Sequence, residues 1–457
     1  MEPRPHDHSP ADGSAGPGSA DASPTSLRTL VLLPDLKQQH EPRAASGAPP
    51  KRSPEARLEE AIGLALAIDL EVVGSWIIPI AAQRPATLFG TGKVEEIKLR
   101  ITTEEAGLVV VDTSLSPVQQ RNLERAWGVK VLDRTALILE IFGERAQTRE
   151  GALQVELAHL HWQKSRLVRS WTHLERQRGG YGFLGGPGET QIEADRRQIQ
   201  GRINRLERDL ESVRRTRALH RKKRVRRDQP VVALVGYTNA GKSTLFNKLT
   251  ESGVRAQNLL FATLDPTLRR VALPHGIEIV LSDTVGFISH LPTDLVAAFR
   301  ATLEEVVEAD LILHVRDIAH PDSEAQSADV EATLEAMDVD PHEPGRVIEV
   351  WNKVDLLPEQ ARARMLENTG PDTVAVSALS GSGLDRLLDR IEQRLTSGRH
   401  EAELELPAEE GELLAWLYRS TEVLEREDSP DTIRLKVRIP ASQSDAFTSK
   451  AGAFVLN

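Results

Sequence analysis

The sequence predicts an α/β protein in which a mostly parallel sheet, with helices on both faces, follows a smaller α/β unit and a long antiparallel helical hairpin. Three observations lead to this prediction. Short apolar runs alternate with helical patterns in residues 27–150. The same alternation returns in residues 229–398, where glycine-containing and polar motifs follow the apolar runs. Between these regions, two stretches with apolar residues at seam-like spacing flank one cluster of glycines.

Composition limits the classes of protein to which the chain can belong. Its 457 residues allow about three domains, and 40% hydrophobic residues suffice for packed cores. The net charge of −11 argues against a general polyanion binder, so local basic patches need separate attention. The absence of cysteine excludes disulfides, zinc fingers and thiol catalysis.

Hydropathy gives no sign of a membrane-spanning or secreted protein. No apolar run is long enough to cross a bilayer, and the N-terminus lacks the apolar core of a signal peptide. We therefore expect a cytoplasmic protein and leave a peripheral membrane association open. We also expect a monomer.

The first two regions of the chain differ in composition. Residues 1–26 are rich in Pro, Gly, Ser, Ala and Asp and lack aromatic residues, so we expect a disordered tail. Residues 27–150, the N-terminal domain, are expected to form a small parallel α/β unit. Its predicted strands lie near 27–33, 71–80, 108–112 and 129–132, and its predicted helices near 54–69, 93–101, 117–126 and 135–142.

A glycine-rich turn precedes the second of these helices. The stretch from Phe89 to Lys93 reads Phe-Gly-Thr-Gly-Lys. One interpretation is a second nucleotide or phosphate site, and the other is a glycine turn that only begins a helix. Because the spacing falls short of a full phosphate-binding loop, the second interpretation is favoured.

Residues 151–228 predict an antiparallel helical hairpin with a glycine-rich tip at 179–190. Two apolar seams support it, and they consist of Leu153, Leu157, Leu160, Leu167 and Trp171, then Ile192, Ile199, Ile203, Leu206, Leu210 and Val213. Exposure of Tyr181, Phe183 and Leu184 at the tip is costly unless a partner covers them.

The second helix of the hairpin is strongly basic within an acidic chain. Positive charge suits nucleic-acid phosphates, and aromatic residues at the tip suit unstacked bases, so we favour contact with RNA. The alternative is a solvated helix that only connects two domains. The basic residues are Arg196, Arg197, Arg202, Arg205, Arg208, Arg214, Arg215, Arg217, Arg221, Lys222, Lys223, Arg224, Arg226 and Arg227.

A phosphate-binding loop lies between a buried strand, residues 231–235, and a helix that begins near residue 245. The spacing is G-x-x-x-x-G-K-S, in which backbone N–H groups and the helix N-terminus bind phosphates. We expect Lys242 to reach the β- and γ-phosphates and the Ser243 hydroxyl to bind Mg²⁺. The loop comprises Gly236, Tyr237, Thr238, Asn239, Ala240, Gly241, Lys242, Ser243 and Thr244.

Two downstream segments are candidates for sensing the γ-phosphate. One follows a predicted strand and comprises Asp283, Thr284, Val285 and Gly286. Here Asp283 can hold Mg²⁺ through water, and the Gly286 amide can sense the third phosphate. The other includes Phe261, Ala262 and Thr263, with Thr263 expected to complete the Mg²⁺ shell and Thr267 as the fallback. Lys242, Thr263 and Gly286 are therefore the candidate catalytic groups.

Two further motifs indicate that the base is guanine. An N-K-x-D motif supplies Asn352, Lys353 and Asp355 at the end of a strand. The Asp355 carboxylate can accept hydrogen bonds from guanine N1–H and the 2-amino group, which adenine lacks. Ser377, Ala378 and Leu379 end another strand, and a backbone N–H there can meet guanine O6. Together the motifs resemble the G domain of translation-factor-type GTPases.

The position after Gly286 is Phe287, where many GTPases have a glutamine that orients water. Phenylalanine has no donor or acceptor, so we expect slow intrinsic turnover and stimulation from outside the chain. Asn239 stands where related GTPases that lack the glutamine hold a potassium ion. An asparagine that only stabilises the loop is an equally good interpretation.

The chain ends with a predicted closing helix of the G domain, near 384–395, and a small α+β appendage at 399–457. The appendage is expected to contain a helix at 408–425 and a strand at 432–439. Nothing in it suggests catalysis.

Most of the chain resembles the HflX family of GTPases. The matching stretches are Phe89-Gly-Thr-Gly-Lys-Val-Glu-Glu, Asp133-Arg-Thr, Ile141-Phe-Gly-Glu-Arg-Ala, Gly185-Gly-Pro-Gly-Glu-Thr-Gln, Phe261-Ala-Thr-Leu-Asp-Pro-Thr and Asp283-Thr-Val-Gly-Phe-Ile-Ser-His-Leu-Pro. The resemblance implies GTP and GDP as ligands, Mg²⁺ as cofactor, and the large ribosomal subunit with its 23S-type rRNA as partner. It further implies a hairpin tip that approaches the peptidyl-transferase centre and a role in splitting or rescuing ribosomes.

Two alternatives remain open on the sequence. One is a GTP-gated RNA-binding or assembly module without splitting activity. The other is ATP-dependent RNA unwinding by residues 27–150, which the resemblance attributes to some relatives.

Overall fold

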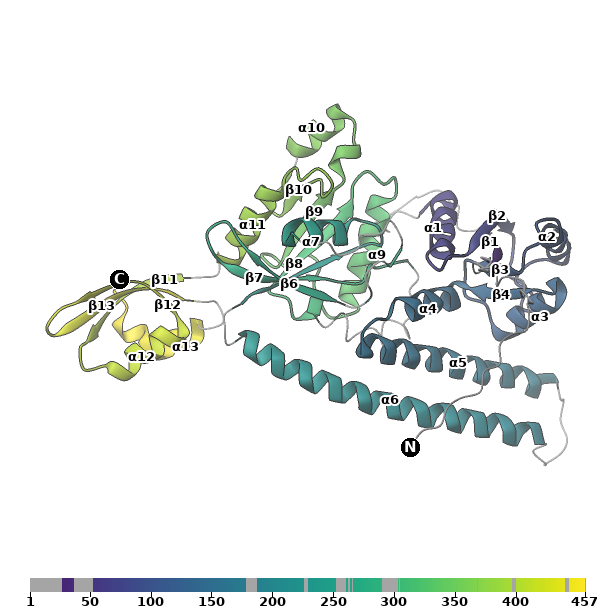
Figure 1. Ribbon diagram of the computed structural model, residues 1–457, viewed down its shortest axis with the longest axis horizontal. Coiled ribbons are helices and arrows are strands. Elements are labelled where there is room, and N and C mark those ends of the chain that lie inside the picture. The colour runs from purple at the N-terminus through teal and green to yellow at the C-terminus, as the bar shows by residue number, and fades with distance from the viewer. Residues whose placement is uncertain are drawn as a thin grey trace, which may run out of the picture.

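The computed structural model arranges the chain as three sheets and a helical hairpin (Figure 1). It describes residues 27–36, 52–177, 187–225, 229–251, 260–261, 264, 266–289, 303, 305–367, 369–396, 400–439 and 444–456. The predicted disordered tail, the aromatic residues of the hairpin tip, and Ala262 and Thr263 lie outside these residues. The predicted α/β class is confirmed.

The N-terminal domain is a four-stranded parallel sheet in the order β2-β1-β3-β4. Its strands β1 and β3 read as continuous apolar runs because helices cover both faces of the sheet. The strands are β1 (Arg28–Leu36), β2 (Glu71–Ile80), β3 (Leu108–Val111) and β4 (Lys130–Asp133), and the helices are α1 (Pro54–Leu66), α2 (Thr91–Thr103), α3 (Pro117–Trp127) and α4 (Arg134–Arg145).

Side-chain caps fix where three of these helices begin. Ser53 accepts the N–H of Ala56 at the start of α1, and Ser116 forms a capping box with Gln119 at the start of α3. Asp133 accepts the N–H of Ala136 at 2.8 Å, so the last residue of β4 is also the N-cap of α4. This tight strand-to-helix junction places Arg134 at the carboxyl edge of the sheet.

The hairpin consists of α5 (Arg149–Gln177) and α6 (Pro187–Val225), which run side by side (Figure 1). The predicted seams meet along the described part, where Leu157 and Leu160 of α5 are buried against α6. The α6 side of this contact consists of Ile203, Leu206 and Leu210. No helix in the described ranges combines the length and apolarity needed to cross a bilayer.

The G domain contains a six-stranded sheet in the order β10-β9-β8-β5-β7-β6, in which only the edge strand β6 is antiparallel. The carboxyl ends of β5, β7, β8, β9 and β10 therefore meet at one edge. The strands are β5 (Val231–Gly236), β6 (Thr267–Ala272), β7 (Glu278–Asp283), β8 (Leu311–Asp317), β9 (Val347–Asn352) and β10 (Thr373–Ala375). The helices are α7 (Lys242–Thr250), α9 (Ser323–Glu335), η2 (Val354–Leu356), α10 (Glu359–Glu367) and α11 (Leu384–Thr396).

The C-terminal part differs from its prediction. The expected helix at 408–425 is too long, because the backbone is extended at Thr421 and the following residues pair with β13. The part is a three-stranded antiparallel sheet, order β11-β13-β12, with helices. Its elements are β11 (His400–Pro407), α12 (Gly411–Ser420), β12 (Glu422–Asp428), β13 (Thr432–Ile439), α13 (Ser444–Ala451) and η4 (Gly452–Phe454).

Candidate functional site

The turn between β5 and α7 requires glycine at two positions. Gly236 has φ +152°, and a Cβ there would lie 2.1 Å from the carbonyl oxygen of Val315 on β8. Gly241 has φ +94°, and a Cβ would lie 2.2 Å from Nδ2 of Asn352 on β9. The close approach of neighbouring backbone and side chains thus fixes both residues as glycine.

Lys242 is the first residue of α7 and its side chain is buried within the loop. Its ammonium group donates to the carbonyl oxygens of Gly236 at 3.0 Å and Tyr237 at 2.8 Å. Burial lowers the pKa of Lys242 to about 8, and the carboxylate of Asp283 opposes that shift only in part. A buried ammonium held by loop carbonyls lies where phosphate oxygens can take over its hydrogen bonds.

The segment after β7 is bound directly to this loop. The Phe287 N–H donates to the Gly236 carbonyl at 3.1 Å, and the Thr238 N–H donates to the Phe287 carbonyl at 2.8 Å. A Cβ on Gly286 would lie 3.1 Å from Nζ of Lys242. Gly286 therefore lies beside the lysine, as a sensor of the third phosphate must.

Neighbouring residues of that segment are buried. The Thr284 hydroxyl donates to the Leu234 carbonyl at 2.6 Å, which ties it to the sheet. Val285 is buried, and so is Phe287, with 2% of its surface exposed. The Phe287 side chain belongs to the apolar core, so it offers nothing to orient water.

The donor chemistry at the start of α7 fits Mg²⁺. The Ser243 hydroxyl donates to Asp283 Oδ2 at 2.8 Å, so one hydroxyl and one carboxylate converge beside the loop. Mg²⁺ in nucleotide sites takes few protein ligands and completes its shell with phosphate and water. The fallback ligand Thr267 opens β6, opposite Asp283.

The guanine motifs are brought to the same edge of the sheet. Asn352 donates through Nδ2 to the Ala240 carbonyl at 2.8 Å and accepts the Ala378 N–H at 3.0 Å. It thereby ties the phosphate loop to the segment after β10. Lys353 adopts φ +65° and pairs with Asp317 at 2.7 Å, and Asp355 is exposed.

The segment after β10 is only partly buried. Ser377 and Ala378 are buried, whereas 74% of Leu379 is exposed. The Ser377 hydroxyl accepts the N–H of Ser380 at 3.1 Å, which closes the loop that carries these residues.

Two predicted ligand residues direct their side chains away from the phosphate loop. The Tyr237 hydroxyl donates to Glu60 of α1 at 2.5 Å. Phe261 packs edge to face on Phe142 of α4, with ring centroids 4.7 Å apart. Both side chains therefore contact the N-terminal domain.

Sequence reasoning missed the residues on the other side of that contact. Glu60 and Arg134 are buried at the edge of the site, together with the side chain of Ser289. The sequence did contain a signal for Glu60. This charged residue lies beside Ala61 and Leu64 on the apolar face of α1, where a charge needs a buried partner.

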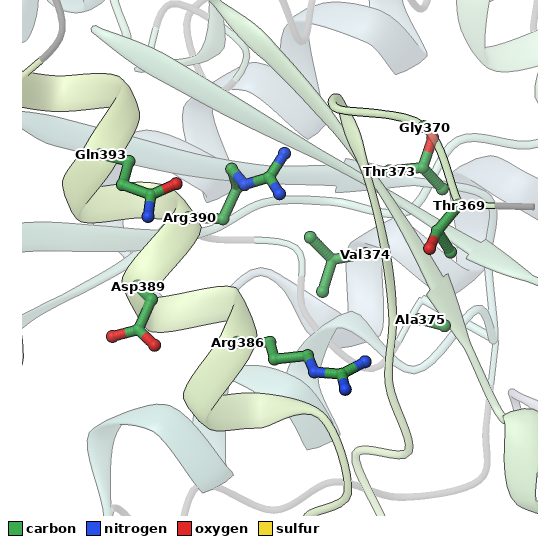
Figure 2. Close-up of a pocket in the computed structure, with 9 residues that line it drawn as sticks. All are labelled: Thr369, Gly370, Thr373, Val374, Ala375, Arg386, Asp389, Arg390 and Gln393. Atoms are coloured by element: carbon green, nitrogen blue, oxygen red, sulfur yellow. The ribbon is translucent and has the colours of Figure 1, made fainter. Parts of the chain in front are cut away.

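A separate cavity of about 350 Å³ lies at the edge of the sheet, between β10 and α11 (Figure 2). Arg386 and Arg390 project from the helix toward the strand that carries Thr373 and Val374. None of the phosphate-loop residues lines it. It is therefore distinct from the site described above.

Comparison with known proteins agrees with this geometry along the chain. Residues 55–143 match the family described as GTP-binding GTPase N-terminal, and residues 145–224 match GTP-binding GTPase Middle Region. Residues 231–353 match the family 50S ribosome-binding GTPase, and residues 362–456 match HflX C-terminal domain.

Relatives similar to this chain include the GTPase HflX of Magnetococcus marinus, 50% identical over 384 residues, covering 84% of this chain and 88% of the relative. The GTPase HflX of Escherichia coli K12 is 47% identical over 362 residues, with 79% and 84% covered. A solved GTP-binding protein of Sulfolobus solfataricus in complex with GDP is 24% identical, with a TM-score of 0.42 and coverage of 80% and 98%. The chain belongs to the HflX family of GTPases, enzymes that hydrolyse GTP to GDP and phosphate.

Proposed function

We propose that this GTPase binds the large ribosomal subunit through its hairpin and that the bound nucleotide controls this binding. The observation that carries the proposal is the basic, exposed face of α6 on an otherwise acidic chain. The match of residues 231–353 to 50S ribosome-binding GTPases supports the same partner.

The charge of α6 is unbalanced along its length. The helix contains twelve arginines and lysines against six acidic residues, whereas the chain has a net charge of −11. Its apolar seam faces α5, and six arginines of the described part are exposed. They are Arg196, Arg197, Arg202, Arg205, Arg208 and Arg215.

Ion pairing within the hairpin neutralises little of this charge. Arg202 pairs with Glu156 of α5 at 2.6 Å, and 63% of the arginine side chain remains exposed. Such surface pairs contribute little and are screened by salt. The arginines are therefore available to rRNA phosphates, and binding should weaken steeply as salt rises.

The chemistry proposed for GTP follows from the site. Lys242 and the Gly286 amide would contact the β- and γ-phosphates, and Ser243, Asp283 and the hydroxyl of Thr263 would hold Mg²⁺, which would neutralise phosphate charge. Since Phe287 is buried and apolar, intrinsic hydrolysis is slow, and the ribosome supplies the missing stimulation. Asp355 selects guanine.

A potassium ion beside Asn239 is a further part of the proposal. Asn239 is exposed at the phosphate loop and has a left-handed backbone conformation, with φ +59°. A monovalent cation there would stabilise charge that develops during hydrolysis. GTPase rates should be severalfold higher in potassium than in sodium, and equal rates would remove the ion from the mechanism.

Cosedimentation with 30S, 50S and 70S particles tests the ribosome proposal. We expect 50S binding with a non-hydrolysable GTP analogue and weaker binding with GDP. Replacement of Arg197, Arg205 and Arg208 by Gln should lower 50S affinity by at least about tenfold. The matched control replaces three exposed arginines of the C-terminal part, Arg419, Arg426 and Arg434, and should bind normally.

Light scattering separates splitting from simple binding. Addition of the protein with a GTP analogue to 70S ribosomes should reduce the scattering if the subunits separate. Cosedimentation without a fall in scattering would instead indicate a GTP-gated binding or assembly module. Binding that is equal in all nucleotide states would contradict the gating.

A further inference from the structure

A buried polar cluster joins the N-terminal domain to the segment after β7, which contains Gly286 and Ser289. Glu60 accepts from Arg134 Nη2 at 2.6 Å, from Arg52 Nη1 at 2.6 Å and from the Tyr237 hydroxyl at 2.5 Å. Arg134 also pairs with Asp112 at the end of β3, at 2.5 Å. Each of these side chains is nearly or fully buried.

The cluster holds the backbone of Ser289 from both sides. The Ser289 N–H donates to the Tyr237 hydroxyl at 2.9 Å, and its carbonyl accepts from Arg134 Nη2 at 3.0 Å. Ser289 follows Gly286 by three positions, and Tyr237 follows the first glycine of the phosphate loop. Any displacement of this segment on loss of the γ-phosphate therefore acts on Arg134.

The residue before Arg134 makes the opposite connection. Asp133 accepts from Arg166 Nη2 of α5 at 2.6 Å and from the backbone N–H groups of Leu115 and Ala136. The Arg166 guanidinium also lies 4.1 Å from the ring centroid of Trp162 on the same helix. Arg134 thus contacts the segment beside the nucleotide site, and the preceding residue, Asp133, contacts α5, the first helix of the hairpin.

A second contact involves the other segment that flanks the γ-phosphate. Phe261 packs on Phe142 of α4, and Leu260 lies so close to α1 that a Cβ on Gly63 would be 3.1 Å from its Cδ1. Helices α1 and α4 therefore contact both segments. This apolar contact is independent of the charged cluster.

The physics of the cluster favours movement as a unit. Burial would raise the pKa of Glu60, but the guanidinium groups of Arg134 and Arg52 outweigh it and hold the pKa below its usual value. Removal of one partner from such a network leaves an uncompensated buried charge. A shift of Ser289 is therefore more easily accompanied by a shift of α4 than by rupture of the cluster.

We propose that Asp133 and Arg134 are positioning residues that couple the nucleotide state at Gly286 to the orientation of α5 through Ser289 and Arg166. The inference rests on the proposed control of the hairpin by nucleotide and names the residues that transmit it. The coupling is reciprocal, so anything that holds α5 in its GTP orientation also favours GTP over GDP.

Hydrogen exchange of α5 amides in the full-length protein, without ribosomes, tests the proposal. In the wild type, exchange in residues 155–167 should differ by about fivefold between GDP and a non-hydrolysable GTP analogue. Tyr237→Phe removes the hydroxyl that binds Glu60 and Ser289 but keeps the ring, and Arg166→Gln removes the ion pair with Asp133. Either variant should reduce the nucleotide-dependent difference to less than twofold.

Arg100→Gln is the matched control, because Arg100 also pairs with a carboxylate, Glu96, and lies over a tryptophan, Trp76, at 4.6 Å. It should keep the wild-type difference. The double variant Tyr237→Phe/Arg166→Gln should show no more loss than either single variant, as expected for one pathway.

Three results would overturn the coupling. They are a wild type without a nucleotide-dependent difference, a difference that persists in both single variants, and an equal loss in Arg100→Gln. The exchange experiment contains no ribosomes, so it tests the coupling separately from ribosome binding. The coupling can fail while nucleotide-dependent cosedimentation is observed, and cosedimentation can fail while the coupling is observed.

Discussion

Two segments of the chain place Gly and Lys at the start of a helix that packs on a parallel sheet, and only one has the geometry of a phosphate cradle. In the turn before α7, Gly241 has φ +94° and Lys242 is buried against loop carbonyls. In the turn before α2, Gly90 has φ −69°. There Lys93 pairs with Glu96 at 2.6 Å and keeps 39% of its side chain exposed.

The difference shows what phosphate binding requires beyond glycine and lysine at a helix N-terminus. A left-handed glycine curls the backbone so that several N–H groups face one point, and burial keeps the ammonium at that point. At α2 the lysine lies along its own helix, and Cβ atoms on Gly90 or Gly92 would meet nothing within 4 Å. We therefore expect the first turn to bind phosphates and the second only to begin a helix.

The largest expected effect comes from removing the two lysines in turn. Lys242→Ala should weaken GTP and GDP binding by about a hundredfold or more, since the buried charge facing the phosphates is lost. Lys93→Ala should leave both affinities within about twofold. Fluorescence of a methylanthraniloyl nucleotide measures both variants.

The same pair of variants tests ATP. If Lys93→Ala abolished an ATP affinity that Lys242→Ala retained, the turn before α2 would be a second nucleotide site. The distinction drawn between the two turns would then be wrong.

A smaller effect is expected from adding one methyl group at each turn. Gly241→Ala should destabilise the protein by on the order of 3 kcal/mol, because the left-handed backbone is strained and the Cβ would meet Asn352. Gly92→Ala lies in open space within α2 and should stabilise by about 0.5 kcal/mol. Urea unfolding of both variants gives the values, and equal losses would contradict the comparison.

The pH dependence of stability should report the buried lysine. The folded pKa of Lys242 is about 8, against 10.5 for the free side chain. Between pH 8 and 10.5 the lysine is protonated in the unfolded chain but largely deprotonated in the folded chain. Lys242 therefore makes the free energy of unfolding rise with pH in this range, and it does not change the pH dependence below about pH 8. The full effect is of order 3 kcal/mol.

Nucleotide-free wild type and Lys242→Met, unfolded in urea between pH 7 and 10.5, isolate that slope. The wild type should gain stability relative to the variant as pH rises, and a constant difference would contradict the assigned burial. GTP affinity should fall over the same range, because the phosphates need the protonated lysine.

Local spacing was enough to place the phosphate loop, the segment with Gly286 and the N-K-x-D motif at strand ends, because backbone geometry there depends on a few adjacent residues. The alternation of Ala402, Leu404 and Leu406 also carried a period-two signal for β11, which the prediction missed. The helix expected at 408–425 was too long, since propensity does not register the pairing with β13.

The charged cluster was beyond a reading of the sequence. Tyr237 and Glu60 are 177 positions apart, and Arg134 and Ser289 are 155 apart. A glutamate on the apolar face of α1 departs from the expected pattern. Only the folded structure shows that arginines distant in the sequence neutralise it. For the same reason the contact between the Tyr237 side chain and the N-terminal domain was not predicted.

Calorimetric titration of the full-length protein with GTP, GDP and ATP in the presence of Mg²⁺ tests the assigned site most directly. We predict one guanine nucleotide bound per chain and no uptake of ATP at comparable concentration. Absence of GTP and GDP binding, or a stoichiometry of two, would contradict a single guanine-selective site before α7.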